Sequence, residues 1–454
     1  MPSSIRKALD ELPVTLDDTY ERALQGIPKE KWQHAHRLFQ CLIEAFRPLD
    51  VRELAEIFAI EFDSDAAPRV VEGFRPENAE EAVLSACSTI ISVINHAGSR
   101  IVQFSHFSVK EYFTSDRLLT SEVGSIRRHY IPLDAAHTIL ARACLTELLQ
   151  LDENMDDERV ATFPLVTYAA RHWVDHANFQ SVASRVQALM ERLFDPRKSC
   201  LAAWTQLYDV DNPYTGWEYR AYQRKGTGTA LYYALLCGFN GLANFLITAH
   251  AEDANAKCGR QGSPLHVALN NRDLDTTRLL LDHGADPKFE DPLGTTPLVK
   301  AYGHRSFETM QLLLEHDPDV VMHRTFFGSV LHDALLYGRT EVVCLLLRYS
   351  GDVNARDRTD QTLLHLASGN GHPKVVELLL DYGAEVDALS RGKRTPLHEA
   401  SQNGHLEVVQ ILLAHGANVL IRENYHHQTA FQLATPKGHT EVAELLLRNG
   451  AEKE

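Results

Sequence analysis

The sequence of 454 residues contains no run of about 18 apolar residues, the length that a membrane-spanning helix requires. Its first residues, MPSSIRKALDELP, lack the apolar core of a secretory signal peptide. The seven cysteines form no Cys-x-x-Cys pair, a pattern typical of reduced thiols in an intracellular protein. We therefore expect a protein of the cytoplasm, with the nucleus as the alternative, and no membrane partner.

None of three long stretches of the chain has an excess of positive charge, and the formal net charge is −16. Residues 1–125 carry 13 basic and 20 acidic groups, residues 126–225 carry 12 and 13, and residues 226–454 carry 20 and 28, so their net charges are −7, −1 and −8. Because phosphate binding depends on clustered Lys and Arg, a nucleic-acid partner is disfavoured throughout. The globular composition and the length predict two to four domains, at roughly 100–200 residues each.

Motifs that would indicate an enzyme are also missing. The sequence has no G-x-x-x-x-G-K-[ST] phosphate loop, no G-x-S-x-G nucleophile elbow and no cysteine in a recognised nucleophile context. His172 and His176 have metal-ligand spacing, but Trp173 stands where a zinc protease needs its glutamate. We expect no catalytic residue, no metal site, no cofactor and no small-molecule substrate.

The C-terminal half contains a repeat with a period of 33 or 34 residues. Its anchor is the third residue of a TPLH-like tetrapeptide, with Ser or Thr two residues before it and alanine three residues after it. The anchors are Leu231, Leu265, Leu298, Leu331, Leu364, Leu397 and Phe431.

The unit RTPLHEASQNGHLEVVQILLAHGAN, residues 394–418, shows how one repeat folds. Thr395 predicts the N-cap of a first helix, with Pro396 in its first turn. Gly404 predicts the end of that helix, since glycine tolerates a positive φ. LEVVQILL has the spacing of a second helix, which Gly416 ends. Such a helix pair cannot bury its apolar face alone, so neighbouring units must stack.

These units resemble ankyrin repeats, and the resemblance covers residues 226–454. Two units depart from the pattern. The first has Tyr232 at the usual histidine position, and the third has Val299 there and Arg305-Ser306 in place of Gly-His. The resemblance implies a solenoid of about seven repeats that binds a protein partner on its concave face. It also implies that the repeat histidines form hydrogen bonds within their own repeats; these are His266, His332, His365 and His398.

The variable positions of the ankyrin pattern lie five and six residues after the anchor and three to six before it, and there we expect the partner to bind. Aromatic residues beside arginines on an otherwise acidic array would form a binding hot spot. The alternative is that the apolar members pack between repeats. The candidate residues are Phe326, Leu336, Tyr337, Arg358, Arg391 and Arg394.

The N-terminal half predicts three helices and a hairpin, the order of a winged helix. Apolar spacing predicts a helix over 31–46, and Asp50 with Glu53 indicates the next helix start. We expect a third helix over 77–95, two strands in ISVINHAGSRIVQFSH, and a helix opened by a capping box of Ser108 and Glu111. The third helix contains no Lys or Arg, which disfavours DNA recognition.

Four segments carry a second resemblance: LPVTLDDTYERAL, RPLDVRELAEIFAI, IVQFSHFSVKEYF and FPLVTYAARHWVDHA. They resemble the part that follows the NTPase in NACHT–ankyrin proteins, mainly of filamentous fungi. The resemblance implies a helical remnant of the region after the NTPase at residues 1–30, a winged-helix-like domain at 31–120, a helical spacer at 121–225 and ankyrin repeats at 226–454. Because no phosphate loop is present, nucleotide binding is not carried over. We expect a natural truncation, a split gene or an incomplete gene model.

The expected fold is thus mainly α: a winged-helix-like domain and a helical spacer followed by an ankyrin-repeat α-solenoid. The expected function is that of a non-enzymatic protein-interaction protein, the adaptor or sensor half of a NACHT-type signalling system. The alternative is a fragment of an ATP- or GTP-dependent switch whose NTPase lies upstream or in a separate chain. A DNA-associated regulator is the third and least favoured hypothesis.

Overall fold

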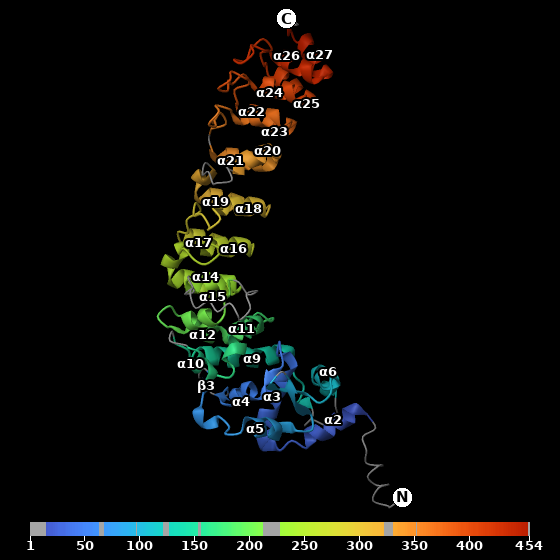
Figure 1. The fold of residues 1–454 in the computed structure, drawn as a ribbon, viewed down its shortest axis with the longest axis vertical. Coiled ribbons are helices and arrows are strands. Elements are labelled where there is room, and N and C mark those ends of the chain that lie inside the picture. Colours follow the sequence, from blue (N-terminus) through green and yellow to red (C-terminus); the bar gives the residue numbers. More distant parts are fainter. Residues whose placement is uncertain are drawn as a thin grey trace, which may run out of the picture. The chain divides into compact units, whose positions relative to one another are not determined.

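The computed structural model describes residues 15–62, 68–96, 98–120, 127–152, 156–211, 228–321, 330–350 and 352–452. The chain forms two compact units, residues 1–249 and residues 250–454. Helices dominate both units, as the sequence predicts, and Figure 1 labels the elements.

The N-terminal unit begins with helices that start at capping boxes. α2 (Leu16–Gln25) follows the Thr15–Asp18 box, and α4 (Val51–Phe58) follows the predicted Asp50–Glu53 box. The side-chain oxygens of Thr15 and Asp50 accept main-chain N–H groups that have no partner within the helix. Between the two helices lie η1 (Lys29–Lys31) and α3 (Trp32–Glu44).

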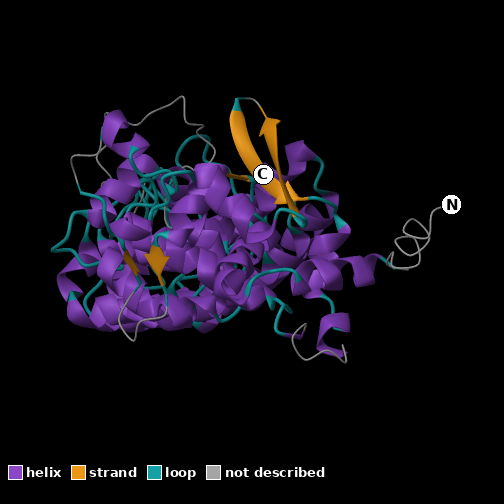
Figure 2. Ribbon diagram, turned by 90° about the horizontal axis from the view of Figure 1, so that it is seen from below, coloured by secondary structure: helices purple, strands orange, loops and turns teal. Residues whose placement is uncertain are grey.

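The predicted third helix is shorter than expected, because α5 covers only Ala79–Cys87 and the chain then enters β4 (Ile91–His96). The β-branched run that follows α5 favours a strand, and pairing with β5 (Ser99–Phe104) decides the outcome. The predicted hairpin is therefore confirmed, whereas the helical assignment of residues 91–95 is wrong. Figure 2 shows β4 and β5 as neighbouring strands.

The hairpin belongs to a three-stranded sheet of order β1-β5-β4, which completes the winged helix. β1 (Leu49–Asp50) is antiparallel to β5, with Leu49 opposite Val102. A second small sheet pairs β2 (Ile60–Glu61) with β3 (Arg69–Val70), and η2 (Glu72–Phe74) follows it.

The capping box expected at Ser108 and Glu111 is also wrong. Ser108 is the first residue of α6 (Ser108–Thr114), whose N-cap is Phe107 and carries no capping side chain. The Ser108 hydroxyl instead lies 2.6 Å from Nδ1 of His106 and 2.7 Å from the hydroxyl of Tyr20. The Ser108 side chain therefore forms a long-range contact with Tyr20 of α2 and does not cap its own helix.

The spacer is helical, as predicted, and packs directly on the winged helix, since α3 contacts α9. Trp173 and Trp204 form its aromatic core, with ring centroids 5.2 Å apart and no exposed surface. α7 (Arg117–Thr120) follows α6 at the end of the winged helix, and the helices of the spacer are α9 (Leu133–Leu148), α10 (Asp157–Ala161), α11 (Val166–Ala177), α12 (Val182–Leu193) and α13 (Cys200–Leu207).

The first repeat, α14 (Ala230–Leu236) and α15 (Asn240–Ala249), belongs to the N-terminal unit. Phe239 stacks on Trp173 with ring centroids 5.2 Å apart. Tyr232, which replaces the usual histidine, donates a 2.5 Å hydrogen bond to Asp211. This unusual residue thus ties the first repeat to the end of the spacer.

The C-terminal unit contains the other six helix pairs. Thr395 caps its helix and Gly404 ends it with a φ of +76°, both as predicted. Leu397 and Ala400 are fully buried, as the anchor and the close-approach alanine should be. The pairs, repeats two to seven, are α16 (Pro264–Asn270) with α17 (Leu274–Asp282), α18 (Pro297–Gly303) with α19 (Phe307–His316), α20 (Val330–Leu336) with α21 (Thr340–Ser350), α22 (Leu363–Gly369) with α23 (Pro373–Asp381), α24 (Pro396–Asn403) with α25 (Leu406–Ala414), and α26 (Ala430–Ala434) with α27 (Thr440–Arg448). The short helices η3 (Ala251–Asn255), η4 (Pro318–Val321) and η5 (Thr435–Lys437) lie between or within them.

Candidate functional site

The loops that precede the first helices of repeats five, six and seven are joined tip to tip. The main-chain N–H of Arg391 donates to the carbonyl oxygen of Thr359 at 3.0 Å, and that of Asn424 donates to Gly392 at 2.9 Å. The ring of Tyr425 lies so close to Gly392 that a Cβ there would come within 2.9 Å of it. We call this continuous surface the hairpin ridge; it comprises residues 356–361, 389–394 and 422–428.

Acidic side chains on the ridge are turned toward the main chain. The Asp357 carboxylate accepts N–H groups of Thr359 at 2.7 Å and Gln361 at 2.9 Å. Glu423, only 3% exposed, accepts the N–H groups of Tyr425 at 2.7 Å and His426 at 2.5 Å. Burial raises the pKa of both carboxyls, but these hydrogen bonds outweigh it and leave each pKa below its usual value. Both groups are therefore ionised and already satisfied.

Basic side chains on the ridge fall into two groups. Arg358, Arg391 and Lys393 are exposed. Arg394 lies 3.2 Å from Glu399 through its Nε atom and also donates to Gln402, so it holds its own repeat together. Arg356 donates to the carbonyl oxygen of Leu389 at 2.6 Å and links two repeats, and Arg422 donates to the carbonyl oxygen of His427 in its own loop at 3.0 Å.

The aromatic candidates lie at the opposite end of a first helix. Leu336 and Tyr337, at the C-terminal end of α20, are 40% and 67% exposed. Neither is buried between repeats. The equivalent positions of the neighbouring repeats hold polar residues or glycine: Asn270, Asn271, Gly303, His304, Gly369, Asn370, Gln402 and Asn403. Phe326 lies outside the described residues.

The structure thus brings Arg358 and Arg391 onto adjacent loop tips, whereas Leu336 and Tyr337 occupy the far end of a first helix. Sequence reasoning missed two ridge residues, Lys393 and Tyr425, of which Tyr425 is 74% exposed. Lys393 lies four residues before its anchor, within the variable window, and Tyr425 lies six before Phe431, so the same positional rule could have found both.

The repeat histidines connect repeats as well as stabilising their own. In His398, Nδ1 lies 2.8 Å from the Thr395 hydroxyl and Nε2 lies 3.3 Å from the carbonyl oxygen of Gln428 in the next repeat. His266 makes the same pair of contacts, and burial lowers the pKa of both histidines to about 4. The expectation of bonds confined to one repeat was therefore incomplete. His332 is half exposed, and its Nδ1 lies 3.8 Å from Oδ1 of Asp333.

A second set of histidines packs against glycines with a positive φ, and each of these glycines belongs to the preceding repeat. His405 lies against Gly371, where a Cβ would come within 2.5 Å of the ring, and its Nε2 is 3.0 Å from the carbonyl oxygen of Gly369. The third repeat lacks this arrangement, because Ser306 stands in place of the histidine. A cavity of about 460 Å³ lies there, lined by Leu269, Arg272, Ala301, His304, Arg305, Ser306, Phe307, Glu308 and Thr309.

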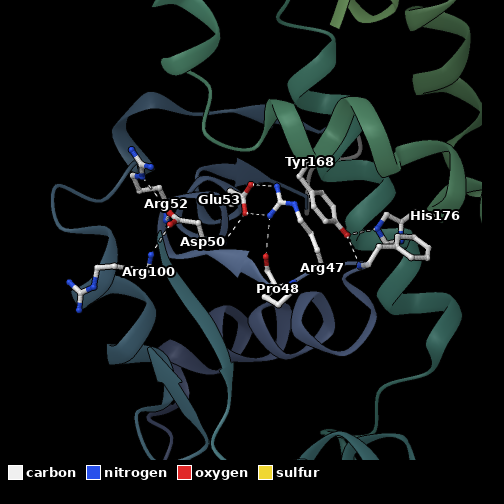
Figure 3. Close-up of polar contacts among 9 residues, drawn as sticks. Arg47, Pro48, Asp50, Arg52, Glu53, Arg100, Tyr168 and His176 are labelled. Carbon is white, nitrogen blue, oxygen red and sulfur yellow. Dashed lines mark hydrogen bonds and ion pairs between the residues drawn. The ribbon is translucent and has the colours of Figure 1, made fainter. Parts of the chain in front are cut away.

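Of the two histidines with metal-ligand spacing, His176 forms hydrogen bonds to protein groups at the junction of winged helix and spacer (Figure 3), whereas Nδ1 of His172 lies 3.7 Å from Oδ2 of Asp175. His176 is fully buried, with Nε2 2.8 Å from the Tyr168 hydroxyl and Nδ1 2.8 Å from Nδ1 of His137. Tyr168 also accepts the main-chain N–H of Phe46 at 3.2 Å. Burial, followed by the charge of His137, lowers the pKa of His176 to about 3.

The same junction holds a strong ion pair. Arg47 donates to Glu53 at 2.8 and 2.5 Å and lies over the ring of Tyr168, 5.1 Å from its centroid (Figure 3). Asp50 accepts the main-chain N–H of Arg100 at 3.2 Å. These contacts fasten the winged helix to the spacer and to its own wing. No described group of three His, Cys, Asp or Glu side chains could hold a metal ion.

These features define the class of the protein: stacked helix pairs of the ankyrin type that follow a winged helix and a helical spacer. Comparison with known families agrees. Residues 231–324, 265–357, 307–390, 331–423 and 364–454 match "Ankyrin repeats (3 copies)", and residues 20–124 match "GPI inositol-deacylase, winged helix domain". The chain is therefore an ankyrin-repeat protein with an N-terminal winged helix domain.

One curated relative is the azaphilone pigments biosynthesis cluster protein L of Monascus ruber, which is 31% identical over 293 residues. The match covers 61% of this chain and 61% of that protein. Within the described ranges, no helix is both long and apolar enough to cross a bilayer.

Proposed function

We propose that the protein is a non-enzymatic adaptor or sensor of the cytoplasm whose ankyrin array captures a protein partner. The winged helix and spacer, fastened together through Arg47, Glu53 and Tyr168, form a separate folded unit that also contains the first repeat. The partner contacts the exposed end of α20 and the hairpin ridge, which includes the candidates Arg358 and Arg391. The protein would act as the adaptor or sensor half of a NACHT-type signalling system.

The observation that carries this proposal is the exposure of Tyr337 beside Leu336. An exposed aromatic and an exposed aliphatic residue stand where the neighbouring repeats carry Asn, Gly, His or Gln. Tyrosine is enriched among residues that dominate protein interfaces, because it buries a large area and loses little conformational entropy. Neither side chain is needed to fill the core, so a role in stability does not account for them.

The test is a comparative pull-down with the full chain. Wild type, the double variant Leu336→Ser/Tyr337→Ser and the control Leu293→Ser would be compared as bait. Leu293 is 75% exposed on the loop before α18, so the control removes an exposed apolar side chain elsewhere on the array. We expect a set of proteins that wild type and the control retain and the double variant loses. Identical retention by all three baits would refute this surface.

DNA recognition finds no support in the helix that would serve it. α5 carries Glu80 and Glu81 in its first turn and contains no Lys or Arg, so it would repel a phosphate backbone. A salt-resolved binding assay with duplex DNA and the full chain would test for DNA recognition, and we expect no measurable affinity at 150 mM salt.

The alternative is that the chain is a fragment of an NTPase switch. An in-frame phosphate-loop motif in the genomic sequence upstream would favour that alternative.

A further inference from the structure

The hairpin ridge has an excess of exposed positive charge on an otherwise acidic array. Residues 226–454 carry 20 basic and 28 acidic groups. On the ridge, Arg358, Arg391 and Lys393 are exposed, and no ion pair within the described residues engages their side chains. Asp357 and Glu423 accept main-chain N–H groups, and among the described residues neither carboxylate forms an ion pair with these cations. Asp360 is the exposed acidic side chain that remains there.

The spacing of the ridge sets the shape of a ligand. Successive first helices pack at about 8–10 Å, and the loop tips are tied to one another by the bonds from Arg391 to Thr359 and from Asn424 to Gly392. A peptide in the extended polyproline II conformation has three residues per turn and advances about 3.1 Å per residue, so its side chains three residues apart lie on one face and about 9 Å apart. Such side chains therefore match cations on successive loops.

We infer that the hairpin ridge binds an extended acidic segment of a protein, with carboxylates three residues apart. The Arg358 guanidinium takes one carboxylate, and Arg391 with Lys393 takes the next. Tyr425, which lies against Gly392 at 74% exposure, offers an aromatic surface to an apolar side chain of the same segment. This inference rests on the proposed function, because it names the chemistry of the partner.

A peptide fits the ridge better than a nucleic acid does. Duplex DNA carries one negative charge per about 1.7 Å along its axis. Such a polyanion would extend beyond three cations onto an array with a net charge of −8, from its 20 basic and 28 acidic groups. A short segment with separated carboxylates engages the cations and avoids that repulsion.

The experiment is a fluorescence-anisotropy titration of the full chain with labelled 12-residue peptides. One peptide carries Glu at every third position between Ser and Ala, the second has the same composition with its Glu residues adjacent, and the third has Lys in place of Glu. We expect the spaced peptide to bind at least about fivefold tighter than the clustered one, and the Lys peptide not to bind. Equal affinity for the spaced and clustered peptides, or no binding of either, would overturn the inference, and neither comparison requires a variant protein.

Variants then locate the site. Arg391→Glu/Lys393→Glu reverses two ridge cations, whereas Arg278→Glu/Lys374→Glu makes the same charge change on the second helices α17 and α23, where both residues are exposed. We expect the ridge variant to lose at least about tenfold in affinity and the control less than threefold, with both thermal midpoints close to wild type. Equal losses would show an effect of net charge alone. Tighter binding of a 12-nucleotide single strand than of the spaced peptide would also reject the inference.

Failure here is distinguishable from failure of the proposed function. If no acidic peptide binds but Leu336→Ser/Tyr337→Ser still loses proteins that wild type captures, the array binds a partner of other chemistry. If the spaced peptide binds and the pull-down finds no difference, the ridge alone is the binding surface.

Discussion

Nε2 of His365 lies 2.9 Å from the main-chain carbonyl oxygen of Arg394, so one side chain joins the fifth repeat to the sixth. Nδ1 of the same ring lies 2.9 Å from the hydroxyl of Thr362 and accepts its main-chain N–H at 3.1 Å. Since His365 is 1% exposed, these polar groups have no access to water. Repeat stacking in this array therefore depends on buried hydrogen bonds as well as on apolar contact.

Replacing His365 should destabilise the array far more than replacing its counterpart His332. His365→Ala removes buried hydrogen-bond partners and should lower the free energy of unfolding by about 2 kcal/mol, because each unsatisfied buried group costs about 1–3 kcal/mol. His332 occupies the same repeat position but is half exposed, so His332→Ala should change stability by less than about 0.5 kcal/mol. Urea unfolding monitored by circular dichroism measures both. Similar losses in the two variants would contradict the structural role assigned to His365.

The buried histidines should make the array acid-sensitive. Burial lowers the pKa of His266 and His398 to about 4, below the usual value of 6.5. The unfolded chain therefore binds more protons between these values, so stability is complete above pH 6.5 and falls as the pH drops toward 4. Each histidine contributes a slope of at most about 1.4 kcal/mol per pH unit.

Urea midpoints at pH 7.5, 6.0 and 5.0 test this dependence. His266→Gln/His398→Gln should reduce the fall in the free energy of unfolding between pH 6.0 and 5.0, because glutamine does not titrate. His283→Gln/His415→Gln is the matched control, since these histidines lie at the ends of the second helices α17 and α25. A pH profile that is unchanged in the first double variant would assign the acid sensitivity to other groups.

A Cβ at Gly371 should be more harmful than one at Gly416, although both glycines have a positive φ, +73° and +86°. At Gly371 the new atom would lie 2.5 Å from the ring of His405, whereas at Gly416 nothing lies within 4 Å. Gly416→Ala should cost about 1 kcal/mol from the left-handed backbone alone. Gly371→Ala should cost about 1–3 kcal/mol more, because the histidine must move and its bond to Gly369 must break. Thermal unfolding of the two variants gives the comparison, and equal losses would contradict the close contact.

The repeats could be predicted from sequence because their signals are local. Thr395, Gly404 and the anchor leucines specify caps, a left-handed turn and a buried stripe within one unit, and each took the expected role. The α5–β4 boundary could not be predicted in this way, because an apolar β-branched run is compatible with either structure until β5 pairs with it. The role of Ser108 likewise depends on a long-range contact, because its hydroxyl lies 2.7 Å from the hydroxyl of Tyr20 and does not cap its own helix.

The candidate surface was predictable by position but not by electrostatics. The anchor rule placed Arg358, Arg391 and Arg394 on the loops, yet only the structure shows that Arg394 is paired with Glu399. Nor does the sequence reveal that the Asp357 carboxylate accepts main-chain N–H groups. A loop with equal numbers of acidic and basic residues can therefore expose more positive than negative charge, because main-chain geometry determines which side chains face the solvent.

Replacing Arg305 by glycine should stabilise the array. Arg305 adopts a φ of +58°, a conformation that costs a residue with a Cβ about 1 kcal/mol relative to glycine. Arg305→Gly should therefore raise the free energy of unfolding by about 1 kcal/mol, and differential scanning calorimetry of the full chain measures the gain. A variant less stable than wild type would contradict the strain assigned to Arg305.

A histidine at position 306 should stabilise the array only when the preceding repeat offers a glycine. The residue of the preceding repeat that corresponds to Gly371 is Arg272, which has a φ of +57° and lines the cavity beside Ser306. Ser306→His alone should therefore give no gain, because the ring would meet the side chain of Arg272, as a Cβ at Gly371 would meet His405. Arg272→Gly/Ser306→His should be more stable than Ser306→His by about 1–2 kcal/mol, and equal stabilities of these two variants in calorimetry would contradict the glycine–histidine contact assigned to the later repeats.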